Sequence, residues 1–203
     1  MEKPEIIRGQ AIREYRQPEK EIESMLLERW SPRSFNGQAV GQDDLERVFE
    51  AARWAPSSYN EQPWRFLYAH RDGPHWEQFF SFMGEFNQKW AANAGVLIVV
   101  VSKKTFKRND KPNRCHSFDT GSAWQNLALQ ATQMGLAAHG MAGFDHNRTA
   151  RELGVPDNCR VECMIALGHP APAQELPDDL RKKEEPSGRN PVAEFVCEGR
   201  WDF

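Results

Sequence analysis

The sequence predicts a central β-sheet covered by helices on both faces. Strand-like and helix-like segments alternate along the chain, which favours a sheet between two helical layers. The run Gly95–Val101 is wholly apolar and rich in β-branched residues, which is typical of a strand buried on both faces. Residues 119–134 are apolar nearly all round, so we expect this helix to be central and buried.

Length and composition indicate a globular chain with a substantial core. The chain has 203 residues, which is enough to bury a core without disulfide or metal staples. Seven Trp and twelve Phe residues exclude a disordered chain. The 26 basic and 29 acidic residues give a net charge of −3, which argues against a nucleic-acid-binding surface.

The sequence gives no indication of a membrane or secretory protein. Its longest apolar run, Val96–Val101, is six residues long, whereas a membrane span needs about 20. The N-terminus lacks the apolar stretch of a signal peptide. Four cysteines without a CxxC pair are too sparse for a secreted disulfide scaffold. We expect a cytoplasmic protein with free thiols and neither membrane nor nucleic acid as a partner.

The first half of the chain predicts helices on either side of a strand. A helical pattern begins at Ile22 and leads up to Arg29. Residues 42–54 place apolar side chains at helical spacing, and Pro56 stops this helix. Residues 64–69 alternate as a strand. The aromatic stripe over 76–90 predicts one further helix, opened by Gly73-Pro74.

The second half repeats the alternation after a basic loop. Residues 103–117 are polar, carry six Lys or Arg residues and predict a loop. Asp119 is suited to cap the helix that runs to Met134, where Gly135 ends it. A strand over 137–141, a helix over 147–153 and a strand over 161–167 follow.

The ends of the chain divide it into an arm, one domain and a tail. Residues 1–20 are polar and patternless, and predict an N-terminal arm over the surface. Residues 21–196 form the domain, in which the Pro-rich, charged stretch 170–188 predicts an exposed connector. Residues 197–203 form a C-terminal tail whose apolar side chains predict packing on this subunit or on a partner.

Common catalytic and metal-binding signatures are absent. The chain contains no GxGxxG, GxxxxGK, GxSxG or HExxH sequence. Its six histidines do not cluster at ligand spacing. We therefore predict no metal site and no catalytic side chain.

Two segments point to a phosphorylated ligand with a flat polar ring. In Arg29-Trp30-Ser31-Pro32-Arg33-Ser34-Phe35, two arginines lie four residues apart, and each guanidinium can donate two N–H groups to phosphate oxygens. A solvated loop is the alternative on spacing alone. Residues 55–64 place small polar side chains between two prolines, which suits a stiff ligand-binding loop or an ordinary helix-to-strand turn.

Taken together and in this order, the two segments resemble the nitroreductase family of flavin enzymes. The patterns are R-x-S-x-R-x-F and A-P-S-S-x-N-x-Q-P-W. The Asp119-Thr120-Gly121 helix opening, the Gly-x-x-Gly-Phe-Asp segment at 140–145 and the Arg-x-Pro at 189–191 follow in matching order. The resemblance covers roughly residues 22–196. It implies an α+β fold: a three-layer α/β/α sandwich with a mostly antiparallel sheet, assembled as an intertwined homodimer with FMN at the interface.

The resemblance implies which residues hold the FMN phosphate. Arg29 matches a phosphate-binding position, and Arg33 one that reaches the phosphate, ribityl or pyrimidine region. Trp30 and Ser31 lie between them, and Arg189 matches the C-terminal phosphate-binding arginine. Many relatives carry a further basic residue where this chain has Ser187, and Arg181, Lys182 or Lys183 could compensate.

The resemblance also implies which residues surround the flavin ring. It matches Pro56, Ser57, Ser58 and Asn60, and more loosely Gln62, to a loop that the second subunit lays against the flavin. Asn87 matches a position that binds the pyrimidine end, and a basic residue frequent three places later is Trp90 here. It matches the N5 region, where the family uses a backbone N–H, to Met141, Ala142 and Gly143. An acidic residue is frequent in relatives at the Ala142 position.

The implied activity is FMN-dependent oxidoreduction with NAD(P)H as the hydride donor. The small-molecule acceptor would be a nitroaromatic, a quinone or an activated alkene, reduced by ping-pong turnover. Because the cofactor supplies the chemistry and the protein binds and tunes it, no catalytic triad is expected. Two alternatives remain open: a flavin-binding redox sensor or carrier with little turnover, and a specialised branch performing reductive dehalogenation or flavin fragmentation.

Overall fold

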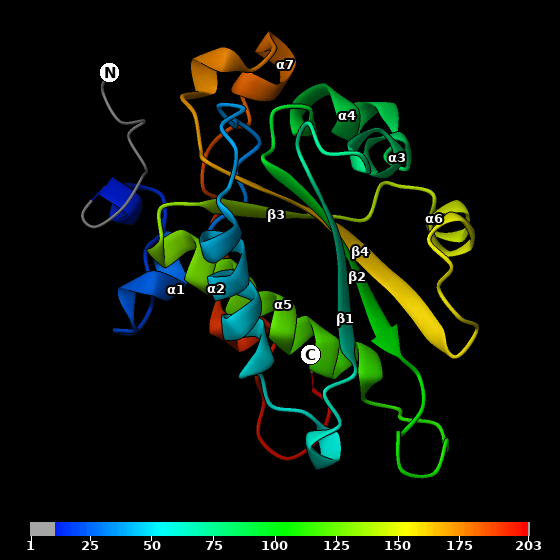
Figure 1. The fold of residues 1–203 in the computed structure, drawn as a ribbon. Coiled ribbons are helices and arrows are strands. Elements are labelled where there is room, and N and C mark those ends of the chain that lie inside the picture. The colour runs from blue at the N-terminus through cyan, green and yellow to red at the C-terminus, as the bar shows by residue number, and fades with distance from the viewer. Residues whose placement is uncertain (1–10, 203) are drawn as a thin grey trace.

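A four-stranded antiparallel sheet separates two helical layers (Figure 1). The structure is a computed structural model that describes residues 11–202. The strands are β1 (Trp64–His70), β2 (Val96–Lys103), β3 (Ala137–Met141) and β4 (Cys159–Gly168). They lie in the order β1-β2-β4-β3, and each strand runs antiparallel to its neighbours. The predicted three-layer α+β fold is confirmed.

The apolar run predicted to be a buried strand forms β2, one of the two inner strands of the sheet. Both of its edges are paired, with Val96 opposite His70 of β1 and Leu167 of β4. Because side chains alternate along a strand, Leu97, Val99 and Val101 face one core and the residues between them face the other. This strand therefore joins the two cores of the molecule.

One helical layer consists of α1 (Ser24–Glu28), α2 (Gln42–Arg53) and α5 (His116–Gln133) (Figure 1). The predicted apolar face of α2 is buried, and it meets α5 and the sheet in a single cluster. The expectation that this helix is central and buried holds for the side of α5 that faces α2 and the sheet. The outer side of α5 is open, and Phe118 is 80% exposed.

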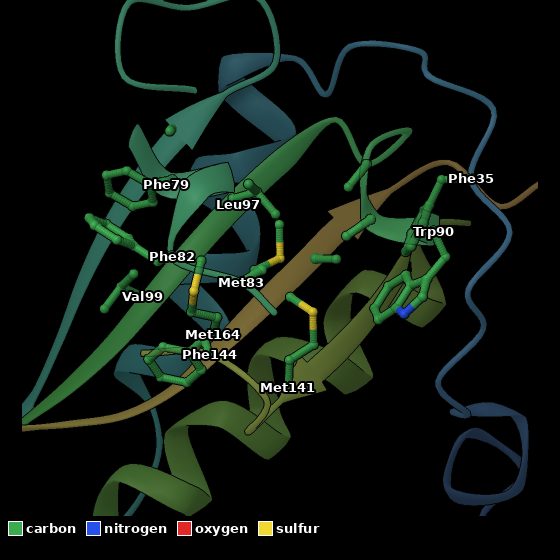
Figure 2. Packing of buried hydrophobic residues seen from close by; sticks show 14 of the residues in the cluster. Phe35, Phe79, Phe82, Met83, Trp90, Leu97, Val99, Met141, Phe144 and Met164 are labelled. Carbon is green, nitrogen blue, oxygen red and sulfur yellow. The ribbon is translucent and has the colours of Figure 1, made fainter. Parts of the chain in front are cut away.

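The other layer consists of α3 (Trp76–Ser81), α4 (Glu85–Ala91) and α6 (His146–Glu152). Its core is rich in aromatic and methionine side chains, which Figure 2 shows packed around Leu97 and Val99. Trp90 lies beside Phe35 at the edge of this cluster, with ring centroids 6.3 Å apart. This contact anchors the segment that carries the two N-terminal arginines.

The single helix predicted over 76–90 forms two helices, because residues 82–84 are not helical and interrupt it. Met83 forms a β-bridge with Phe144, and the backbone N–H of Gly84 donates to the Gly143 carbonyl at 3.0 Å. The backbone at the break is therefore paired with the segment after β3. The aromatic periodicity continues across the break, so the stripe alone conceals it.

The loop predicted over 103–117 is shorter than expected, and Asp119 does not cap α5. Lys103 ends β2, a bridge joins Thr105 to Pro112, and α5 begins at His116 after Cys115 as N-cap. Asp119 therefore lies within the first turn of the helix. We call residues 104–115 the basic loop.

Short elements occupy the turn between α2 and β1 and both ends of the described chain. They are η1 (Ala11–Glu14), η2 (Ser58–Asn60), η3 (Ala173–Glu175), α7 (Asp178–Arg181) and η4 (Val192–Glu194). The connector expected to be exposed contributes Leu176 and Leu180 to the core, so that prediction is wrong at these positions.

Part of the predicted N-terminal arm is built into the fold. Residues 1–10 lie outside the described part of the chain, whereas Ile12 and Arg16 are buried. Apolar side chains of the C-terminal segment, including Phe195 and Trp201, are exposed in the single chain. The division at residues 20/21 and 196/197 stays a prediction. Within residues 11–202, no helix is long and apolar enough to cross a bilayer.

Candidate functional site

Three arginines from distant parts of the sequence meet at the end of α1. Arg16 is 7% exposed and donates to the carbonyl oxygens of Leu27 and Arg29 at 2.7 Å each. Its Nε donates to the Ser187 carbonyl at 2.9 Å. Arg16 therefore joins the end of α1 to the segment that carries Arg189.

The guanidinium groups of this cluster repel one another. Burial, followed by the charges of Arg189 and Arg29, lowers the pKa of Arg16 to about 10. Burial and the charge of Arg189 also lower the pKa of Arg29. Like charges held together disfavour the charged form, so a bound anion would relieve this repulsion.

Arg33 extends the cluster and is held by a buried carboxylate. Glu184 Oε1 accepts the backbone N–H groups of Arg33 and Ser34 at 2.6 and 2.8 Å. Arg33 Nη1 lies 3.9 Å from the second carboxylate oxygen. The Nε–H of Arg33 is buried without a hydrogen-bond partner among the described residues. A buried donor without an acceptor costs free energy. A ligand oxygen that accepted the Arg33 Nε–H would remove this cost.

A cleft of about 530 Å³ lies between the start of α4 and the end of β3, which is within the usual range for small-molecule sites. It is lined by Gly84, Glu85, Phe86, Asn87, His139, Gly140, Met141, Ala142 and Gly143. The cleft therefore brings together the four residues of one chain that were predicted to contact the flavin ring, namely Asn87, Met141, Ala142 and Gly143. Met141 is buried at its base, whereas Ala142 and Gly143 are exposed.

Close backbone packing shapes this cleft. Asn87 Nδ2 donates to the Gly143 carbonyl at 3.0 Å. A Cβ at Gly143 would lie 2.9 Å from the same Nδ2 atom, so a larger residue would require the Asn87 side chain to move. The break between α3 and α4 thus brings Asn87 to the end of β3.

His139 connects the cleft to the arginine segment. Its Nδ1 lies 2.9 Å from the Pro32 carbonyl oxygen, and its ring packs 4.5 Å from that of Trp90. Burial lowers the pKa of His139 to about 4, and the charges of Arg33 and Arg29 act in the same direction. The imidazole is therefore neutral at pH 7, with Nδ1–H donating to the carbonyl.

The predicted loop Pro56–Gln62 lies elsewhere. Figure 1 places η2 beyond the end of α2, at the opposite end of the molecule from α4. The cavities that this loop lines, one with Lys107 and one with Phe118, share no residue with the cleft. One chain therefore does not bring all the predicted residues together.

The loop has an unusual backbone. Tyr59, Asn60 and Gln62 have φ values of 54°, 54° and 52°, in the left-handed region that costs other residues than glycine roughly 1–2 kcal/mol each. Such strain persists only where the surroundings impose it. Ser57 Oγ accepts the Gln62 N–H, and Asp119 Oδ2 accepts the Ser58 N–H, both at 3.0 Å.

The remaining predicted residues lie in or beside the arginine cluster. Ser31 Oγ accepts a hydrogen bond from Arg29 Nη1 at 3.2 Å, and Trp30 is partly exposed beside it. Arg189 is exposed and donates to the carbonyls of Ser187 and Gly188, so Ser187 contributes its backbone to the cluster.

Sequence reasoning missed Arg16, Glu184 and His139 as parts of the site. Arg16 falls in a segment without periodicity, and Glu184 lies in a connector expected to be exposed. The histidines were interpreted as surface or core residues rather than metal ligands. Glu184 stands beside Glu185 in a charged stretch, and a pair of acids there gives no signal that one of them binds backbone N–H groups.

These features suit a phosphorylated planar cofactor such as FMN. The arginine cluster supplies several cationic donors and one buried N–H without an acceptor, which match a phosphate monoester. The cleft next to it is partly walled by glycine backbone, which allows a flat ring to approach closely. Among residues 11–202, no group of acidic, His and Cys side chains could hold a metal ion.

Comparisons with known proteins agree with this arrangement. A solved oxidoreductase described as containing FMN is 44% identical to the chain. It superimposes with a TM-score of 0.89, covering 92% of this chain and 96% of that one. An Archaeoglobus fulgidus protein provisionally named NADH dehydrogenase/NAD(P)H nitroreductase is 30% identical over 158 residues, which are 74% of this chain and 86% of that protein.

A further relative shows that the similarity extends to a specialised enzyme. The iodotyrosine deiodinase of Haliscomenobacter hydrossis is 26% identical over 180 residues, which are 76% of this chain and 81% of that protein.

The family model described as "Nitroreductase family" matches residues 26–78 and 71–169. These ranges cover most of the chain and include the residues on both sides of the cleft. The chain therefore belongs to the nitroreductase family.

Proposed function

We propose that this protein is an FMN-dependent oxidoreductase that uses NAD(P)H to reduce a nitroaromatic, a quinone or an activated alkene by ping-pong turnover. The observation that carries the proposal is the junction at His139. There, a cluster of mutually repelling arginines adjoins a cleft of about 530 Å³. One end of this combined site suits a phosphate and the other a flat heterocycle.

The arginine cluster would hold the phosphate. Arg29, Arg33 and Arg189 present the charge, while Arg16 and Glu184 fix the backbone that carries them. Each charge-assisted hydrogen bond is worth roughly 1.5–3 kcal/mol. This part of the site therefore contributes cofactor affinity and places the ring toward the cleft.

The cleft would orient the ring and tune it. Asn87 and the exposed backbone at Ala142 and Gly143 form its polar rim. When bound, FMN supplies the hydride chemistry at N5 of its ring. Positive charge and backbone N–H groups near such a ring stabilise the negative charge that develops on reduction. No acidic or basic side chain of the chain is required to transfer a proton.

We propose that a second copy of the chain completes the site with Pro56, Ser57, Ser58, Asn60 and Gln62. Support comes from their distance from the cleft within one chain and from the exposed apolar side chains on α5 and the C-terminal segment. A homodimer would bury these side chains and close the ring from its open side. We also propose a cytoplasmic location, because free thiols suit a reducing compartment.

The two alternative functions, a redox sensor or carrier and a specialised enzyme branch, each require the cleft to be covered in a particular way. A sensor or carrier needs a closed pocket, but Gly84, Phe86 and Ala142 are exposed at the cleft. The C-terminal segment lines a separate cavity of about 340 Å³ instead. A dehalogenating or fragmenting branch needs a lid, but the basic loop packs on residues 59–61 of its own chain. Because the proposed second copy would cover part of the cleft, turnover assays decide between these functions.

Steady-state oxidation of NADH and NADPH by the FMN-loaded protein tests the proposal. We expect turnover that depends on an added quinone or nitrofuran, with parallel double-reciprocal plots in donor and acceptor. Stoichiometric FMN without acceptor-dependent turnover would favour the sensor. Faster iodide release from an iodinated phenol than quinone reduction would favour the dehalogenating branch.

A further inference from the structure

We infer that Asp119 is a positioning residue that fixes residues 57–62 in their ligand-binding shape. The functional part of this inference rests on the proposed role of the loop against the flavin. Asp119 is 4% exposed, and its Oδ2 accepts the backbone N–H of Ser58 at 3.0 Å. It contributes nothing to the apolar packing of the helix that carries it.

The carboxylate reaches the loop from a rigid base. Asp119 lies in the first turn of α5 (His116–Gln133), which packs along α2 and the sheet. A negative group in this turn also interacts favourably with the helix dipole. Because α5 begins three residues before Asp119, this side chain does not cap its own helix and can accept from Ser58.

The hydrogen bond at Ser58 fixes the loop directly before its residues of left-handed conformation. The left-handed residues Tyr59 and Asn60 follow it directly. The loop's other bonds, such as Gln62 N–H to Ser57 Oγ and Gln62 Nε2 to the Asn60 carbonyl, join it to itself. They set its local shape without setting its position relative to the helices.

Other contacts from outside the loop are exposed. Arg65 of β1 donates from Nη1 to the Gln62 carbonyl at 3.0 Å, and others come from the basic loop. The Lys107 N–H donates to Glu61 Oε1 at 2.6 Å, and the Arg108 guanidinium lies 4.5 Å from the centre of the Tyr59 ring. Exposed contacts of this kind contribute little. The partly buried bond from Ser58 to the 4% exposed Asp119 is therefore the contact that places the loop against α5.

Hydrogen exchange of the unliganded protein tests this placement directly. In Asp119→Ala, the peptide spanning residues 55–63 should exchange about tenfold faster. The hydrogen bond from Ser58 to residue 119 is absent in this variant, so local opening of the loop costs less free energy. Asp119→Asn keeps an oxygen acceptor, so its exchange should stay within about threefold of wild type. Asp145→Ala is the matched control, since it removes a carboxylate that accepts the Arg148 N–H at 2.9 Å outside the loop.

FMN titration of the same variants tests the functional part. We expect Asp119→Ala to bind FMN about tenfold more weakly, with a shifted visible band, and Asp119→Asn to behave as wild type. Where Asp119→Ala does not fold, Asp119→Ser replaces it, because its hydroxyl is too short to reach Ser58 and should give the same losses.

The outcomes separate the two proposals. Wild-type exchange in Asp119→Ala, or equal losses in Asp119→Ala and Asp119→Asn, would overturn the role of the Asp119 acceptor. Faster exchange with unchanged FMN affinity and spectrum would overturn its link to the ligand. Failure of the wild-type chain to bind FMN would instead refute the proposed function, while the exchange experiment would still decide whether Asp119 holds the loop.

Discussion

The carboxylate of Glu184 holds the turn that presents Arg33: its Oε1 accepts the Arg33 backbone N–H at 2.6 Å. The same oxygen accepts the Ser34 N–H at 2.8 Å, and the Glu184 side chain is only 3% exposed. A residue close to the C-terminus therefore fixes one of the two N-terminal arginines. The phosphate end of the site depends on segments 150 residues apart in the sequence.

Glu184→Ala should destabilise the protein by about 2–4 kcal/mol, because two buried N–H groups lose their acceptor. Glu184→Gln keeps an amide oxygen and should remain within about 1 kcal/mol of wild type at pH 7. Urea unfolding of the three proteins measures both effects. Equal destabilisation by alanine and glutamine would contradict the role given to this acceptor.

The pH dependence of the Glu184 effect has a defined sign. Burial raises the pKa of Glu184 above its ordinary value of 4.5, so the folded state binds the proton more tightly than the unfolded state. The resulting stability is present below pH 4.5 and is lost as the pH rises through the folded pKa. Relative to Glu184→Gln, wild type should therefore gain stability as the pH falls toward 4.5.

His139 should make the protein less stable in mild acid. Its pKa is lowered from 6.5 to about 4 by burial, so the unfolded state takes up a proton that the folded state excludes. Stability should fall as the pH decreases from 6.5 to 4, by up to about 3 kcal/mol. His139→Gln does not titrate, and its unfolding free energy should lack this component. Identical pH profiles for the two proteins would show that His139 is not held neutral.

Arg29→Ala combined with Arg33→Ala should remove the preference for a phosphorylated ligand. We expect FMN affinity to fall at least about 100-fold, because two charge-assisted interactions are lost, while riboflavin affinity changes little. Arg47→Ala with Arg53→Ala removes two exposed arginines of α2 and serves as the control. Isothermal titration of both ligands gives the comparison. Unchanged FMN affinity in the first variant would refute the phosphate assignment.

Phe118→Glu should yield a monomer with little bound FMN. Phe118 is 80% exposed on the outer side of α5, where a second copy would bury an aromatic ring worth about 2–3 kcal/mol. Lys89→Glu reverses a charge at an exposed position on α4 and should stay dimeric. Light scattering over a dilution series gives the mass of each variant. A wild-type chain that is monomeric and fully active would contradict the proposed dimer.

The sequence predicted most of the architecture because its periodic patterns are local. The run at Val96–Val101 and the apolar face of 42–54 each identify an element without knowledge of the rest. The break before Asn87 was missed because helical periodicity continues through Met83, and only the pairing of Met83 with Phe144 reveals it. Asp119 was misplaced because carboxylates favour both helix caps and first turns.

The candidate site was only partly predictable, since its support is non-local. The motifs identified Arg29, Arg33 and the residues at the end of β3. Arg16 and Glu184 act through backbone groups far away in sequence, and no spacing rule connects such positions. The burial of Leu176 and Leu180 was not predicted, because the Pro and charged residues around them are also typical of exposed loops.

A crystal structure of the protein grown with excess FMN tests the central claim most directly. We expect the phosphate within hydrogen-bonding distance of the Arg29 and Arg33 guanidinium groups and the ring in the cleft beside Asn87 and Gly143. Ser58 of the partner subunit should lie against the open side of the ring. Electron density that shows the cleft filled by the chain's own side chains, with FMN bound elsewhere or not at all, would contradict this claim.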